Sequence, residues 1–121
     1  MFVGVLAKLS VDRKTAQLIL GYCVVKFGMN PLRPLPKICV RRNESKSYGC
    51  YSLKTNAITL YVHTHEQTDN PVYEFVDTII HEYKHYLQAV ESGKFSYTDQ
   101  HEKEAIKFSN KHSTKFKELF G

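Results

Sequence analysis

The stretch His81-Glu82-Tyr83-Lys84-His85 fits the pattern H-E-x-x-H. On a helix, two histidines four residues apart stand on one face, so their ring nitrogens can bind one metal ion. A zinc ion held in this way lies about 2.0–2.1 Å from each histidine nitrogen. Glu82 is rotated by about 100° from His81 around the helix axis. Its carboxylate is therefore expected beside the metal, where it can take a proton from a zinc-bound water.

The residues around the motif predict the helix that this chemistry needs. Asn70-Pro71 supplies a cap and a first-turn proline before the motif, and Ser92-Gly93 supplies a stop after it. An amphipathic helix that merely carries two surface histidines is the alternative interpretation. The helical period of three and four appears in a run of apolar residues: Val76, Ile79, Ile80, Tyr83, Leu87 and Val90.

Composition is that of one ordinary domain, spanning residues 1–121. The chain is 42% hydrophobic and carries a net charge of +5, with its basic residues scattered rather than blocked. Contact with nucleic acid is compatible with this charge but is not favoured by it. No stretch is long enough to span a bilayer, and no signal peptide is recognised, so we expect a cytoplasmic protein of a cell or of a virus-infected host. Three cysteines, an odd number without a C-x-x-C pair, indicate reduced thiols.

Periodicity and turn residues along the chain predict an α+β domain. Short turns between the three expected strands favour an antiparallel meander. The predicted elements are, in order, a helix at about 12–27, strands at 37–41, 48–53 and 57–63, the motif helix, and a last helix at about 99–119.

A catalytic zinc usually has three protein ligands, so a partner for the two histidines is expected from the last helix. Glu102, His101 and His112 lie within about 50° of the centre of its inward face, whereas Glu104 lies roughly 110° away among lysines. Glu102 has a second interpretation as a helix-capping residue, because Asp99 stands three positions before it. The inward face is defined by five residues: Ala105, Phe108, Phe116, Leu119 and Phe120.

H-E-x-x-H followed by a helix with the pattern E-x-E-A-x-x-F-S resembles the gluzincin metallopeptidases, and most of all the small ImmA/IrrE-like and minigluzincin groups. The resemblance covers about residues 48–120 and implies a minimal zincin-like fold. It implies that Glu102 is the third zinc ligand, with Ala105 and Phe108 at the positions of the small and aromatic residues that follow. It further implies a zinc-dependent metallopeptidase that uses Glu82 as general base and binds a peptide substrate along the strand at 58–63, as a monomer or small oligomer.

Two alternatives stay open at this point. His112-Ser113-Thr114-Lys115-Phe116 is similar to the H-G-x-x-F segment of SprT-like proteases, which act on DNA-bound proteins and use a third histidine, although the glycine is missing here. The other alternative is a non-catalytic binding protein whose zinc is structural and joins two helices. A structural zinc has four protein ligands and no open position, which distinguishes it from a catalytic site.

Further residues are candidates for supporting roles. His63 and His65 would share one face at the end of the third strand, a spacing that can bind metal. Asp77 lies one turn before His81 and could orient its ring. Three tyrosines are candidate donors to a transition-state oxyanion: Tyr51, Tyr61 and Tyr97.

Overall fold

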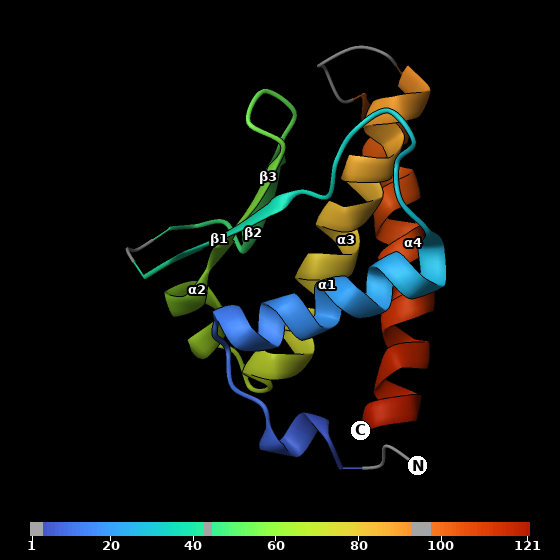
Figure 1. The fold of residues 1–121 in the computed structure, drawn as a ribbon. Coiled ribbons are helices and arrows are strands. Elements are labelled where there is room, and N and C mark those ends of the chain that lie inside the picture. The colour runs from blue at the N-terminus through green and yellow to red at the C-terminus, as the bar shows by residue number, and fades with distance from the viewer. Residues whose placement is uncertain (1–3, 43–44, 93–97) are drawn as a thin grey trace.

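The computed structural model describes residues 4–42, 45–92 and 98–121, with the side chains of 90–92 left aside. It is an α+β fold with four α-helices and a three-stranded mixed sheet (Figure 1). The elements are η1 (Leu6–Lys8), α1 (Arg13–Phe27), β1 (Lys37–Arg41), β2 (Gly49–Ser52), β3 (Ala57–Tyr61), α2 (Val62–Glu66), α3 (Pro71–Ser92) and α4 (Asp99–Phe120). Every helix of these described residues is too short or too polar to cross a membrane.

The sheet differs from the predicted antiparallel meander, which was wrong for one of its two pairings. The strand order is β1-β3-β2, with β3 antiparallel to β2 but parallel to β1. The turn at 53–56 does join β2 and β3 as a hairpin, as its length predicted. β3 takes the centre because its Ile58 and Leu60 are completely buried, and a central strand offers the most covered positions.

The third strand is also shorter than predicted. It ends at Tyr61, and the chain turns at once into α2, so His63 and His65 lie on a short helix and not on a strand end. His65 is fully buried, with Nδ1 2.8 Å from the Tyr61 carbonyl oxygen and Nε2 2.9 Å from Thr78 Oγ1. Burial lowers the pKa of His65. Its Nε2 joins α2 to α3 through Thr78, and its Nδ1 contacts the residue that caps α2. The structure does not bring these two histidines into a metal site.

Helices α1 and α3 pack against the sheet, and α4 lies antiparallel to α3 on the side away from it (Figure 1). The sequence allows Ser10 or Asp12 as the cap of α1, and the structure uses Asp12, whose carboxylate accepts a hydrogen bond of 2.8 Å from Thr15 N. Each fully buried large apolar side chain in such a core contributes about 1.5–3 kcal/mol. The core includes Ile19, Cys23, Ile38, Ile58, Leu60, Phe75, Val76, Ile79, Ile80, Tyr83, Tyr86 and Phe116.

A polar connection holds the end of α1 against α3. Gly28 caps α1 with φ of +79°, a conformation that favours glycine, and its carbonyl oxygen accepts a hydrogen bond from the Tyr83 hydroxyl. Asn30, almost completely buried, donates its side-chain amide to the Tyr86 carbonyl oxygen at 3.1 Å and its backbone N–H to the Tyr86 hydroxyl. Tyr83 and Tyr86 therefore fix the helix that carries the H-E-x-x-H motif from the face opposite its histidines.

The three cysteines are free thiols, as their odd number indicated. Cys23 is buried in the core, where burial raises the pKa of its thiol far above the usual range. Cys39 and Cys50 both face Thr59 from opposite sides of β3. A central strand therefore separates the two thiols.

Candidate metal centre

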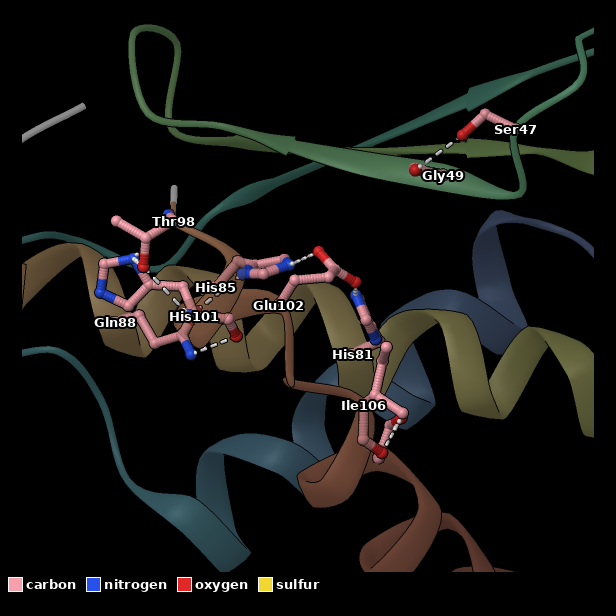
Figure 2. A network of polar contacts seen from close by, with 10 residues as sticks. Ser47, Gly49, His81, His85, Gln88, Thr98, His101, Glu102 and Ile106 are labelled. Carbon is pink, nitrogen blue, oxygen red and sulfur yellow. Dashed lines mark hydrogen bonds and ion pairs between the residues drawn. The ribbon is translucent and has the colours of Figure 1, made fainter. Parts of the chain in front are cut away.

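Two helices bring together the three residues that sequence predicted as metal ligands. His81 and His85 project from α3, and Glu102 projects from the first turns of α4 and reaches between them (Figure 2). The distances are 2.8 Å from His81 Nε2 to Glu102 Oε1 and 3.2 Å from His85 Nε2 to Glu102 Oε2. One ligand atom from each residue lies within 4.8 Å of the other two. We call His81, His85 and Glu102 the metal group, because together they could hold a metal ion.

A hydrogen-bonded amide orients one of the two histidines. Gln88, fully buried on α3, donates its Nε2 to the His101 carbonyl oxygen at 2.9 Å, which turns its Oε1 toward His85. His85 Nδ1 lies 2.7 Å from that oxygen and must donate its proton to it. A neutral His85 consequently presents the lone pair of Nε2 to the carboxylate of Glu102. A cation between these groups would satisfy both, so the donor set fits a bound metal.

Glu82 is set back from this group and is almost completely buried, with 8% of its surface exposed. Burial, followed by the nearby negative charge of Glu102, raises the pKa of its carboxyl from 4.5 to about 7. A hydrogen bond from the backbone N–H of Tyr51 acts in the opposite direction and fixes the carboxylate against β2. Glu82 thus has the raised pKa that suits a general base working near neutral pH.

His81 is also tuned by burial, which lowers the pKa of its imidazole despite the opposing effect of Glu102. A positive charge on His85 also lowers the pKa of His81. A histidine must be neutral to bind a metal, so a lowered pKa extends the range in which His81 can do so.

The other candidates for third ligand lie elsewhere. His112 packs between Phe27 and Phe108, with ring centroids 4.7 Å and 4.5 Å away, on another side of α4. His101 accepts a hydrogen bond of 3.1 Å from the backbone N–H of Thr98 and forms part of the helix cap. Glu104 is exposed, as its place on the helical wheel predicted.

The capping interpretation of Glu102 is wrong in its details. Thr98, and not Asp99, caps α4, and the residue that completes the capping box is His101. The carboxylate of Glu102 is therefore directed to the histidines of α3 instead of to the end of its own helix.

Asp77 and Tyr51 do not have the supporting roles that the sequence predicted for them. Asp77 forms an ion pair with Lys117, with 3.0 Å between Oδ1 and Nζ, and does not orient His81. The hydroxyl of Tyr51 donates to Asn56 Oδ1 at 2.6 Å and accepts from Arg33, away from the metal group. Tyr97 lies outside the described residues. Sequence reasoning also missed Gln88, because a buried amide has no characteristic spacing in a sequence.

A cleft of about 330 Å³ opens beside Glu82. His81 and Glu82 form part of its wall, together with Thr78 one turn earlier on α3. The opposite wall is the segment from Ser47 to Gly49 at the start of β2, which Figure 2 shows above and to the right of His81 and Glu102. A small molecule or an extended chain in this cleft would contact Glu82 and His81 together.

Gly49 determines how closely the sheet approaches α3 at this cleft. A Cβ atom on Gly49 would lie 2.7 Å from the Thr59 carbonyl oxygen and 2.9 Å from Thr78 Cγ2, closer than real Cβ atoms come. Only glycine fits here without a shift of the strand or of the helix.

The strand beside the cleft is β2, and not the predicted strand at 58–63. Both edges of β3 are already paired, so no peptide can add to its backbone. The Tyr48 carbonyl oxygen accepts a hydrogen bond from the backbone N–H of Tyr61, so these two residues form a hydrogen-bonded pair. Such pairs alternate along an antiparallel ladder, so the N–H and C=O groups of Gly49 and Tyr51 point away from β3. These groups form the outer edge of β2, which faces Glu82. On this edge the Gly49 carbonyl oxygen accepts from Ser47 Oγ, and the Tyr51 N–H donates to the Glu82 carboxylate.

Comparisons of the chain with protein-family models, with curated proteins and with solved structures found no match. The resemblance to gluzincins and to SprT-like proteases therefore stays a prediction from short motifs.

Proposed function

We propose that this protein is a zinc-dependent metallopeptidase with a minimal zincin-like fold. One observation carries the proposal: a His81–His85–Glu102 group adjoins a buried glutamate, Glu82, at the wall of a cleft. Two histidines and a glutamate are one of the ligand sets of catalytic zinc. When bound, the zinc ion would act as a Lewis acid and lower the pKa of a coordinated water to about 7.

The number of donors argues for catalysis over a structural metal. Within the described parts of the chain, His81, His85 and Glu102 are the members of the group, one fewer than the four protein ligands of a structural zinc. The Glu102 side chain is 51% exposed, so its side of the group opens to solvent. Both features leave room for a water or a substrate oxygen.

Glu82 would move the proton. Its carboxylate accepts a proton from the water that attacks the peptide carbonyl carbon, and it then delivers that proton to the leaving amine nitrogen. Burial and the charge of Glu102 raise its pKa to about 7, so neither the charged nor the neutral form is strongly disfavoured near neutral pH. The Tyr51 N–H holds the carboxylate in place through both steps.

The substrate would bind in extended form along the outer edge of β2, antiparallel or parallel to Gly49 and its neighbours. The Gly49 carbonyl oxygen now accepts a hydrogen bond of 3.0 Å from Ser47 Oγ, and a substrate N–H could replace that hydroxyl. A peptide held at this edge would lie between β2 and the cleft wall formed by His81 and Glu82.

The test uses zinc-loaded protein and a disordered protein substrate, with cleavage followed by mass spectrometry. We expect wild type to cleave, Glu82→Gln to keep its zinc but lose at least 100-fold in rate, and chelator to abolish cleavage. Glu104→Gln, which removes an exposed carboxylate from the same helix as Glu102, is the matched control and should cleave like wild type. Cleavage by Glu82→Gln at the wild-type rate would refute the assignment of the base.

A further inference from the structure

A group of lysines gathers on a side of the molecule where α1, α3 and α4 meet, away from the cleft. Its centre is His112, which lies between the rings of Phe27 and Phe108. Lys84 of α3 places its ammonium 5.1 Å from the centre of the Phe108 ring. We define the lysine cluster as Lys26 from α1, Lys84 from α3, and Lys107, Lys111 and Lys115 from α4.

All three helices that meet at this surface contribute positive charge around His112. Burial lowers the pKa of His112 first, and four lysines lower it further: Lys111, Lys115, Lys26 and Lys84. No carboxylate contributes to that shift. The nearest acids on α4 are Glu104 and Glu118, which stand toward the two ends of the cluster.

The cluster is unfavourable for the isolated fold. Lys107, Lys111 and Lys115 follow one another at intervals of four, the spacing at which like charges repel on a helix and destabilise it. Among the residues that the structure describes, no ion pair involves any member of the cluster, whereas Lys117 on the same helix is paired with Asp77. A polyanionic partner would turn this repulsion into attraction.

We propose that the lysine cluster binds the phosphate backbone of a nucleic acid. Successive α4 lysines rise by about 6 Å along the helix axis, so the three together offer a row of positive charge about 12 Å long to a strand that carries a phosphate about every 3.4 Å of its axis. Lys26 and Lys84 widen this row into a surface that can contact the backbone beside it. Lysine acts on phosphate as a point charge without base-edge geometry, so the binding should not depend on sequence.

A membrane surface fits the cluster less well. Peripheral membrane helices bury a continuous apolar face next to their basic residues. The apolar side of α4 packs on the rest of the fold through Ala105 and Phe116. The exposed side chains of Val25 and Ile106, each next in sequence to a lysine of the cluster, come from two helices and do not form such a face. An acidic peptide must also lose chain entropy to align its carboxylates, whereas a duplex presents its phosphates on an already ordered backbone. Both remain outcomes that the experiment can return.

The experiment measures binding to a labelled 20-base-pair DNA duplex by fluorescence anisotropy from 50 to 200 mM NaCl. Chelator is present throughout, so a failure of the zinc proposal cannot affect the result. With about 0.9 counterions released for each phosphate neutralised, five lysines predict a slope of about −4.5 in log K against log salt. The triple variant Lys107→Gln, Lys111→Gln, Lys115→Gln should reduce the magnitude of that slope by about 2 to 3.

A second triple variant, Lys14→Gln, Lys37→Gln, Lys54→Gln, removes the same charge from other exposed positions. Its slope should stay within about 1 of wild type, and circular dichroism should show both variants folded. If the two triple variants reduced the magnitude of the salt slope equally, the proposal would be overturned in favour of an effect of net charge. Tighter binding to phosphatidylserine vesicles or to a polyglutamate peptide than to the duplex would also overturn it.

Discussion

Replacing Glu82 with Gln should stabilise the metal-free protein, and the gain should grow with pH. The folded protein raises the pKa of this carboxyl from 4.5 to about 7, so folding favours its neutral form. Below pH 4.5 the carboxyl is neutral whether the chain is folded or unfolded, and its stabilising contribution is complete. Between pH 4.5 and 7 the unfolded chain releases the proton first, so stability falls, and above pH 7 the loss is complete.

The magnitude follows from the size of the shift. At about 1.4 kcal/mol per pKa unit, a rise from 4.5 to about 7 corresponds to about 3 kcal/mol. Little solvent screening applies, because Glu82 is only 8% exposed. Gln keeps the size of the side chain and its acceptor for the Tyr51 N–H, but it does not titrate. For a domain of this length, about 3 kcal/mol is roughly 10 °C in melting temperature.

The assay is thermal unfolding in chelator between pH 4.5 and 8, for wild type, Glu82→Gln and the exposed control Glu104→Gln. We expect Glu82→Gln to match wild type near pH 4.5 and to melt roughly 10 °C higher at pH 8, with Glu104→Gln close to wild type throughout. Zinc should narrow the gap at pH 8, because a nearby dication stabilises the carboxylate. Parallel curves for wild type and Glu82→Gln would refute the reasoning, since they would mean that burial does not penalise this charge.

Three further changes test the site and its surroundings. Glu102→Gln should lose zinc affinity by well over 100-fold, while Glu104→Gln keeps full zinc occupancy by elemental analysis. In chelator, both variants should unfold at nearly the same temperature as wild type. Full zinc occupancy in Glu102→Gln would exclude Glu102 as a ligand. Gln88→Met should weaken zinc binding about 10–100-fold in a competition titration, and unchanged affinity would show that His85 needs no such partner. Gly49→Ala should lower the free energy of unfolding by about 1–3 kcal/mol in urea titrations, with partial recovery when Thr78→Ser is added; a neutral effect would mean that the sheet can move away from α3.

The helices of this protein were predictable because their signals are local. Asp12 begins α1, and the spacing of apolar residues identified α3 and α4 to within a few residues. Helical geometry reduced the candidates for the third ligand to Glu102, His101 and His112, because it fixes which residues share a face. The resemblance to gluzincins then selected Glu102 among these three.

What failed depended on contacts between distant segments. The parallel pairing of β1 with β3 joins residues twenty apart, such as Lys37 and Ala57, and no turn signal encodes it. The sequence predicts strand at Val62, where α2 begins, because this residue is β-branched and apolar. Its complete burial depends on tertiary contacts that the local sequence does not reveal. Gln88 and the choice of Thr98 over Asp99 as cap likewise depend on geometry that spacing cannot distinguish.

The central place of β3 has a consequence for the order in which the protein folds. The β2–β3 hairpin closes a loop of four residues, with Asn56 in the left-handed conformation, and can form in microseconds. Addition of β1 closes a longer loop and loses more chain entropy. We therefore expect the hairpin to dock on α3 first, through Tyr51 and Glu82, so that the cleft would be assembled before the sheet is complete. A pulse-labelling hydrogen exchange experiment would then find the amides of β3 that face β2 protected earlier than those that face β1.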